Sequence, residues 1–182
     1  QAADLCQELQ SSYPIVLTRN FDTAKLWVKS HARGTERYGL LASSEGKRLR
    51  GAGIWVPTQI DHVNWFLKGK DHVDSSYYLE VAASEFKVQG LEVDYAIVAW
   101  DADFRYINGD FDYFRFRGTR WNHTNIKQRQ QYQKNAYRVL LTRARQGLVI
   151  YIPEGSQEDQ SRIPALYDGT YRYLLSCGIP EI

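Results

Sequence analysis

Two arginines near the end of a predicted helix are the residues in this sequence best suited to chemistry. Apolar side chains follow helical spacing through residues 135–150: Ala136, Val139, Leu140 and Ala144. We expect Gly147 to end this helix before a buried strand at Leu148–Ile152. Arg143 and Arg145 then lie where the helix stops. A guanidinium held there can act as an arginine finger on a phosphoryl group. It would also complement the helix dipole by ~0.3–1 kcal/mol without doing any chemistry.

A second cluster combines cations with aromatic rings. Residues 113–134 contain no acidic residue, and their cations are Arg115, Arg117, Arg120, Lys127, Arg129 and Lys134. Cations for phosphates with aromatic faces for bases are typical of a single-strand nucleic-acid surface. The candidate contact residues are Arg115, Arg117, Arg120 and Trp121. However, the strict alternation of Tyr113–Arg117 equally predicts a β-hairpin whose aromatic side chains pack on the domain. Both interpretations stay open.

A third pattern could bind a metal ion. Asp74 with Glu85 and Lys87 resembles the acidic pair and Glu-x-Lys arrangement that positions Mg²⁺ and a water for nuclease chemistry. Glu-x-Lys is common by chance, so a nuclease is the less favoured alternative. The four histidines lack the spacing of metal ligands: His31, His62, His72 and His123. No other metal site is predicted.

The sequence has no phosphate-binding loop of the Walker type. Gly39 to Arg48 comes nearest, but six residues separate Gly39 from Gly46, and Arg48 replaces the hydroxyl that would hold Mg²⁺. Asp101 follows a hydrophobic run, yet without such a loop it has no metal to hold, and we interpret it as a turn residue. The chain is therefore expected not to hydrolyse a nucleotide alone.

The predicted elements alternate between strands and helices, which favours a parallel α/β sheet. Strands are predicted at Pro14–Thr18, Tyr38–Ala42, Tyr77–Ala83 and Tyr95–Trp100. Helices are predicted at Ala2–Leu9, from a cap at Asn20 or Asp22 to Arg33-Gly34, and at Thr58–Leu67. The length of 182 residues suits one domain.

Composition excludes some classes of protein. No run approaches eighteen apolar residues, so no membrane partner is expected. The net charge of +2 does not by itself indicate nucleic acid. Two cysteines, Cys6 and Cys177, show no pairing or metal-ligand pattern, which favours a reduced, cytoplasmic setting. The chain lacks methionine and begins with glutamine, so we expect it to be a piece of a longer polypeptide.

The arginine-bearing segment resembles a known family. Val139-Leu-Leu-Thr-Arg-Ala-Arg145 is similar to motif VI of superfamily 1 helicases, and Ser84–Val98 is similar to their motif V. With a motif IV-like strand at Ile15, the chain looks most like the Schlafen-like helicase domain family of microbial NTPases. The resemblance implies a RecA-like three-layer domain with a mostly parallel sheet. Residues 1–182 would form one C-terminal lobe, with motif V at about 84–98, an insertion at 101–134 and motif VI at about 135–147.

The same resemblance implies ATP with Mg²⁺ as cofactor, bound mainly by a P-loop lobe that is absent from this chain. Arg143 would be the arginine finger. Gln89, where the family often has lysine, and Gly90 would face the γ-phosphate and couple it to nucleic-acid binding. Glu92 would accept a hydrogen bond from the ribose.

Two further arginines have weaker roles by resemblance. Arg145 matches an auxiliary nucleotide contact, and Arg19 could reach the adenine edge of the cleft. The implied partners are the N-terminal P-loop lobe of the same polypeptide and single-stranded DNA or RNA. The alternative to a helicase lobe is a binding module that recognises nucleic acid or a protein without using a nucleotide.

Overall fold

A four-stranded parallel sheet forms the centre of the computed structural model, which describes residue 4, residue 8 and residues 10–182. Its order is β1 (Ile15–Thr18), β7 (Ala144–Tyr151), β3 (Val93–Ala99) and β2 (Tyr38–Ala42). Each pairing is parallel. The predicted α/β class is confirmed. The helix expected at Ala2–Leu9 lies, apart from residues 4 and 8, outside the described residues.

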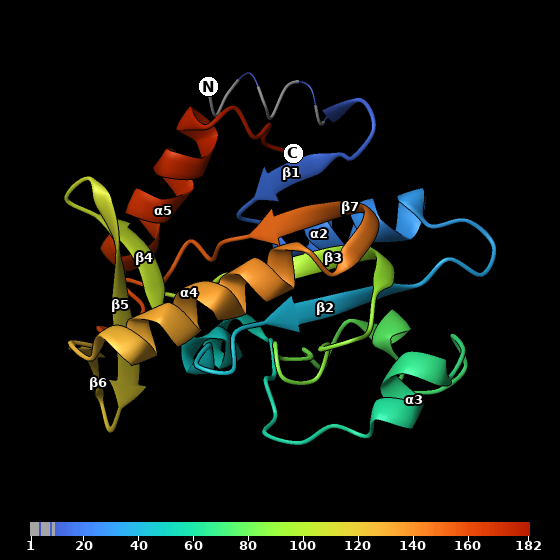
Figure 1. Cartoon of the computed structure of the whole chain (residues 1–182), viewed down its shortest axis with the longest axis horizontal. Coiled ribbons are helices and arrows are strands. Elements are labelled where there is room, and N and C mark those ends of the chain that lie inside the picture. The colour runs from blue at the N-terminus through green and yellow to red at the C-terminus, as the bar shows by residue number, and fades with distance from the viewer. Residues whose placement is uncertain (1–3, 5–7, 9) are drawn as a thin grey trace.

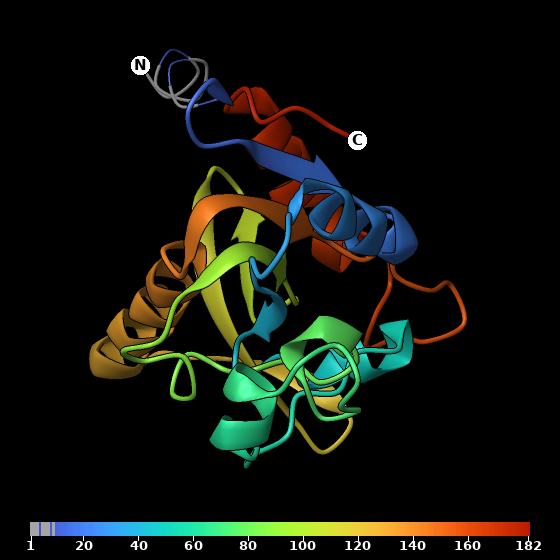
Figure 2. The ribbon, with the colours of Figure 1, turned by 90° about the vertical axis from the view of Figure 1, so that its right-hand side faces the viewer.

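Helices cover both faces of this sheet, so the domain has three layers (Figures 1 and 2). On one face, Ala24 and Val28 of α2 (Phe21–His31) pack with the strands. On the other face lie α4 (Lys127–Leu141) and α5 (Ala165–Ser176). The side chain of Asn20 caps α2 by accepting a hydrogen bond from Thr23 N, as predicted. Every residue of β2 and β3 is buried, as a sheet covered on two faces requires.

Two predicted elements differ from the structure. Residues 77–83 do not form a regular strand: η2 (Ser76–Tyr78) is a 3-10 turn, and single bridges at Val81 and Ala83 follow it. A leucine with φ of 58° at position 79 breaks the extended conformation. The helix expected at Thr58–Leu67 begins later, as α3 (His62–Leu67), because Asp61 caps it by accepting hydrogen bonds from two backbone N–H groups.

The predicted helix stop at Gly147 is also wrong. Helix α4 ends at Leu141, where the hydroxyl of Thr142 donates to the carbonyl oxygen of Arg138 at 3.0 Å. Strand β7 already begins at Ala144. Gly147 lies inside that strand, where a Cβ would stand 2.9 Å from the carbonyl oxygen of Pro14. Its small size is needed for close packing rather than for a turn.

The predicted hairpin is present and belongs to a small antiparallel sheet. Its order is β4 (Phe104–Ile107), β5 (Asp110–Arg117) and β6 (Arg120–His123). This sheet stands beyond the carboxyl ends of the main strands, beside α5 and the first turns of α4 (Figure 1). A 3-10 segment, η1 (Lys47–Ala52), follows β2. No helix in the described residues is long and apolar enough to cross a membrane.

Candidate functional site

The motif V and motif VI segments meet at the amino edge of β3 and β7. Val93 pairs with Ala144 in the parallel register, and Val93 N donates to the carbonyl oxygen of Arg143 at 3.0 Å. Glu92 and Arg143 are therefore neighbours, although far apart in the sequence. Hydrogen bonds between parallel strands fix this arrangement.

The loop before β3, residues 84–92 (the motif V loop), carries exposed polar side chains at this edge. Turn hydrogen bonds within the loop, such as Leu91 N to Val88 O at 3.0 Å, hold its backbone. Gly90 has φ of 82°, a conformation that glycine adopts most easily. A Cβ built at this position would have no atom within 4 Å, so the backbone is open on that side. Gln89, Gly90 and Glu92 are exposed. Within the described residues, the side chains of Gln89 and Glu92 make no hydrogen bond, so both are available to a ligand.

Arg143 stands in the turn between α4 and β7 with its side chain half-buried. One Nη lies 3.4 Å from the hydroxyl of Thr142, and its Nε is buried without a hydrogen-bond partner. No carboxylate in the described part of the chain pairs with it. A buried polar nitrogen without a partner is uncommon in folded proteins.

Arg145 is engaged within the domain. Its Nη lies 2.7 Å from Asp94 Oδ1, and the Asp94 carboxylate also accepts from Arg37 N at 2.6 Å and from Gln146 Nε2 at 3.3 Å. Burial raises the pKa of Asp94, but the hydrogen bonds from Arg37 and Arg145 outweigh it and hold the pKa below its usual value. The pair joins the start of β3 to β7 beside Arg143. Positioning is the role that this geometry favours for Arg145.

Arg19 lies at the opposite, carboxyl edge of the sheet. It follows β1, forms an ion pair with Asp168 at 2.7 Å and donates to Pro153 O at 2.7 Å. Its guanidinium also stands over the ring of Tyr171 at 5.0 Å. The structure therefore brings together Gln89, Gly90, Glu92, Arg143 and Arg145, but not Arg19.

A groove of about 750 Å³ lies between the motif V loop, the residues after β2, the hairpin and α4. Three large apolar side chains on its walls are exposed: Phe86 at 69%, Ile126 at 52% and Tyr132 at 63%. Four amide side chains lie among them: Gln89, Gln128, Gln133 and Asn135. Arg115 also lines the groove, where its charge is paired with Glu45. The sequence analysis did not predict these apolar residues. Tyr132 could have been noticed, because it is an aromatic residue among the polar residues of α4.

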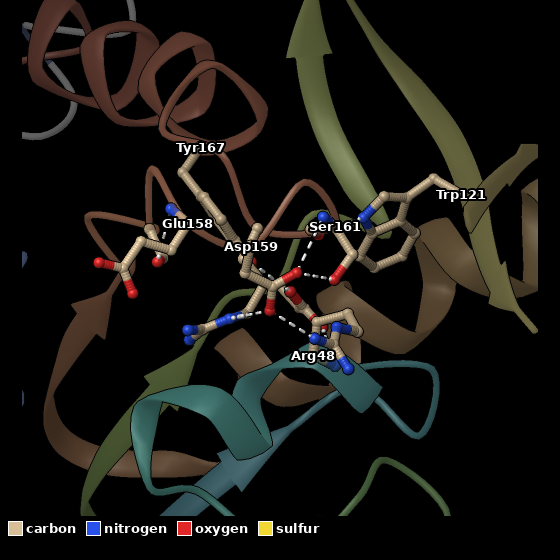
Figure 3. Close-up of polar contacts among 9 residues, drawn as sticks. Arg48, Trp121, Glu158, Asp159, Ser161 and Tyr167 are labelled. Atoms are coloured by element: carbon tan, nitrogen blue, oxygen red, sulfur yellow. Dashed lines mark hydrogen bonds and ion pairs between the residues drawn. The ribbon is translucent and has the colours of Figure 1, made fainter. Parts of the chain in front are cut away.

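Of the hairpin side chains predicted to bind nucleic acid, some pack on the domain and others are exposed to solvent. Figure 3 shows Trp121 reaching the loop before α5, where its indole Nε1 donates to Ser161 O at 2.8 Å. Asp159 anchors that loop by accepting hydrogen bonds from Ser161, Arg162 and Arg48 (Figure 3). The structure thus favours packing over base stacking for Trp121. Arg117 and Arg120 are exposed and form no ion pair within the described residues.

Replacing Trp121 by alanine is expected to destabilise the fold. Removing a large aromatic side chain from a core lowers the free energy of unfolding by about 3–5 kcal/mol. Because Trp121 is only half-buried, we expect a loss of stability near or below the lower end of that range. Unfolding of the chain in urea measures this free energy. Unchanged stability with weakened single-strand binding would instead support the stacking interpretation.

The carboxylates of the nuclease alternative are engaged or exposed separately. The Glu85 carboxylate accepts hydrogen bonds from the backbone N–H and the hydroxyl of Ser44, at 2.8 and 2.6 Å. Asp74 is an exposed loop residue. Across residues 10–182, no three His, Cys, Asp or Glu side chains are grouped so that they could hold a metal ion. The geometry gives no support to the nuclease alternative.

The fold and the motif V and VI edge together define a helicase-type α/β domain. Residues 1–154 match the family described as Schlafen group 3, DNA/RNA helicase domain. The match covers most of the chain, so the chain belongs to that family, as its motifs predicted. No curated protein and no solved structure matches the chain.

Proposed function

We propose that this domain is the C-terminal RecA-like lobe of an ATP-dependent nucleic-acid helicase or translocase. The observation that carries the proposal is the meeting of the motif V loop with Arg143 at one edge of the sheet. Within the described residues, the exposed side chains of Gln89 and Glu92 form no hydrogen bond, and the half-buried Arg143 has no carboxylate partner; they come from two segments that are remote in sequence. A P-loop lobe of the same polypeptide would hold most of the nucleotide, and this edge would face it across a cleft.

The residues present fit ATP with Mg²⁺, which would supply the transferred phosphoryl group. The Glu92 carboxylate can accept a hydrogen bond from a ribose hydroxyl. The Gln89 amide can donate to a terminal phosphate oxygen, and Gly90 leaves the backbone open to close approach. The guanidinium of Arg143 can stabilise negative charge as it shifts among phosphate oxygens. Arg145, held by Asp94, keeps the start of β7 in place beside Arg143.

A single strand of DNA or RNA is the proposed second ligand. The exposed rings of Phe86 and Tyr132 can take unstacked bases, and the amides between them can bind base edges. Because Arg115 is paired with Glu45, phosphate contacts fall instead to Arg117 and Arg120 on the hairpin. A module that binds nucleic acid without nucleotide would use the same groove, but it would not need Arg143.

The isolated chain is expected to show no ATP turnover. The backbone amides and the lysine of a P-loop normally cradle the phosphates, and this chain has neither in the required spacing. Phosphate release by the purified 182-residue chain, with and without single-stranded nucleic acid, measures this. Steady turnover that persists through further purification would contradict the two-lobe arrangement.

A further inference from the structure

Two buried carboxyl groups lie behind the groove, in the loop that joins β3 to β4. Asp101 and Asp103 are 1% and 0% exposed. Asp101 stands at the turn after β3, as expected, and is also enclosed: its carboxylate accepts from the N–H groups of Ala102 and Arg48 and from the hydroxyl of Tyr167. Fully buried aspartates are rare because burying a charge is costly. Nothing in the proposed ATP site uses either of them.

Asp103 connects α4 to the rest of the domain. Its carboxyl group accepts hydrogen bonds from the hydroxyl of Tyr137 at 2.5 Å, the hydroxyl of Ser43 at 2.8 Å and the amide of Gln133 at 3.1 Å. Gln133 and Tyr137 stand one turn apart on α4, and Ser43 follows β2 directly. Ser43 and Gln133 also line the groove. One carboxyl group therefore links the helix, the sheet and the wall of the groove.

We propose that Asp103 is a positioning residue for α4, and that negative charge on Asp103 loosens the hold of this helix on the sheet. The helix continues from Tyr137 to its end at Leu141, two residues before Arg143. Its hold on the sheet therefore sets where the guanidinium stands. The functional importance of the position of Arg143 rests on the proposed function, whereas the effect of Asp103 on α4 does not.

The direction of the effect follows from the cost of burying the charge. Burial, and then the nearby Asp101, raise the pKa of Asp103 to about 7, against the hydrogen bonds from Tyr137, Ser43 and Gln133. In an opened state, where water reaches the carboxyl group, its pKa would be near ~3.9. The closed state therefore binds more protons between these values, and rising pH favours opening until about pH 7.

Other charged groups around Asp103 do not reverse this direction. Asp101 adds negative charge from the same loop. Burial, with Asp103 and Asp101, raises the pKa of the Tyr137 hydroxyl on α4, and burial with Asp101 raises that of Tyr167 on α5. Arg105 on β4 is buried against the ring of Phe114 at 3.6 Å, and burial lowers its pKa to about 10, so it stays cationic near neutral pH. From η1, Arg48 contributes its backbone N–H to Asp101, and its guanidinium is paired with Asp159.

Amide hydrogen exchange of the 182-residue chain, measured from pH 5 to 8, tests the proposal. Rates are converted to protection factors against the unstructured chain at each pH. We expect protection of the α4 amides to fall as pH rises, by up to about tenfold per pH unit, and to level off above about pH 7. Asp103→Asn should abolish this fall and leave protection at pH 8 at or above that of the wild type. Glu158→Gln, which neutralises an exposed carboxylate, should retain the fall.

Tyr137→Phe gives a second variant that keeps the ring in the core. It removes a hydrogen bond that lowers the pKa of Asp103, so the pH above which α4 protection stops falling should be higher than in the wild type. Protection of α4 that does not change with pH in the wild type would overturn the proposal. A fall of equal size in β1 and α2 would also overturn it, because Asp103 would then act on overall stability only.

A measurement on the two-lobe parent separates this proposal from the proposed function. There, Asp103→Asn should flatten the dependence of kcat on pH while leaving KM for ATP unchanged. If the parent has no ATPase activity, the proposed function fails, but the exchange result on α4 stands. If the ATPase is present and α4 shows no pH-dependent protection, the role of Asp103 fails alone.

Discussion

Arg143→Ala in the two-lobe parent should lower the kcat for ATP hydrolysis by ~10³–10⁵, the range known for arginine fingers. Arg143 is half-buried in the turn between α4 and β7, and no carboxylate in the described residues pairs with it. Its interaction with phosphate should strengthen as charge shifts in the transition state, so KM for ATP should change much less than kcat. Steady-state ATP turnover of the wild type and the variant provides the measurement.

Two control variants distinguish a finger from a helix cap. Arg143→Lys should restore little activity, since an ammonium on a flexible chain does not reproduce the planar guanidinium. Arg145→Ala should have a smaller effect on kcat, because Arg145 is paired with Asp94 within the domain and would act only by positioning the start of β7. A correctly folded Arg143→Ala parent that hydrolyses ATP at the wild-type rate would refute the assignment.

Removing both Phe86 and Tyr132 by alanine substitution should weaken single-strand binding strongly. Each base stacked on an aromatic ring contributes ~1–3 kcal/mol, so losing two contacts corresponds to roughly 30-fold to 10⁴-fold in affinity. Both rings are more than half exposed, so their loss should leave the fold intact. Binding of a fluorescent oligonucleotide at several salt concentrations measures the effect. The slope of affinity against salt should stay unchanged, because no phosphate contact is lost.

Arg117→Ala with Arg120→Ala is the matched control for that experiment. These exposed cations would contact phosphates, so their loss should flatten the salt dependence while leaving the contribution of the bases in place. Equal affinity of the wild type and the Phe86, Tyr132 double variant would show that bases do not bind in the groove. Arg115 is a poorer choice of control, since its removal would leave Glu45 without a partner.

The sequence by itself determined the class of fold and the motif segments. The buried strand β2 was predicted with its observed bounds, Tyr38–Ala42, and its five apolar or small residues suit a strand covered on both faces. Strict alternation in Tyr113–Arg117 made a packed hairpin one of two open interpretations, and the structure contains the hairpin. These features depend on local periodicity, which a single chain carries without any knowledge of its neighbours. The family followed from the motif V and motif VI residues, which the match over residues 1–154 confirms.

Only the tertiary structure decided how these segments meet. The parallel register of β3 and β7 sets Glu92 beside Arg143, and that pairing depends on packing between remote segments. The role of Gly147 depends on Pro14, which lies beside it only in the folded sheet. Asp103 is enclosed because α4 and the residue that follows β2, both remote in sequence, bring three hydrogen-bond donors to it. In each case the deciding neighbour is distant in sequence, so the physical reason is long-range contact, which local patterns do not encode.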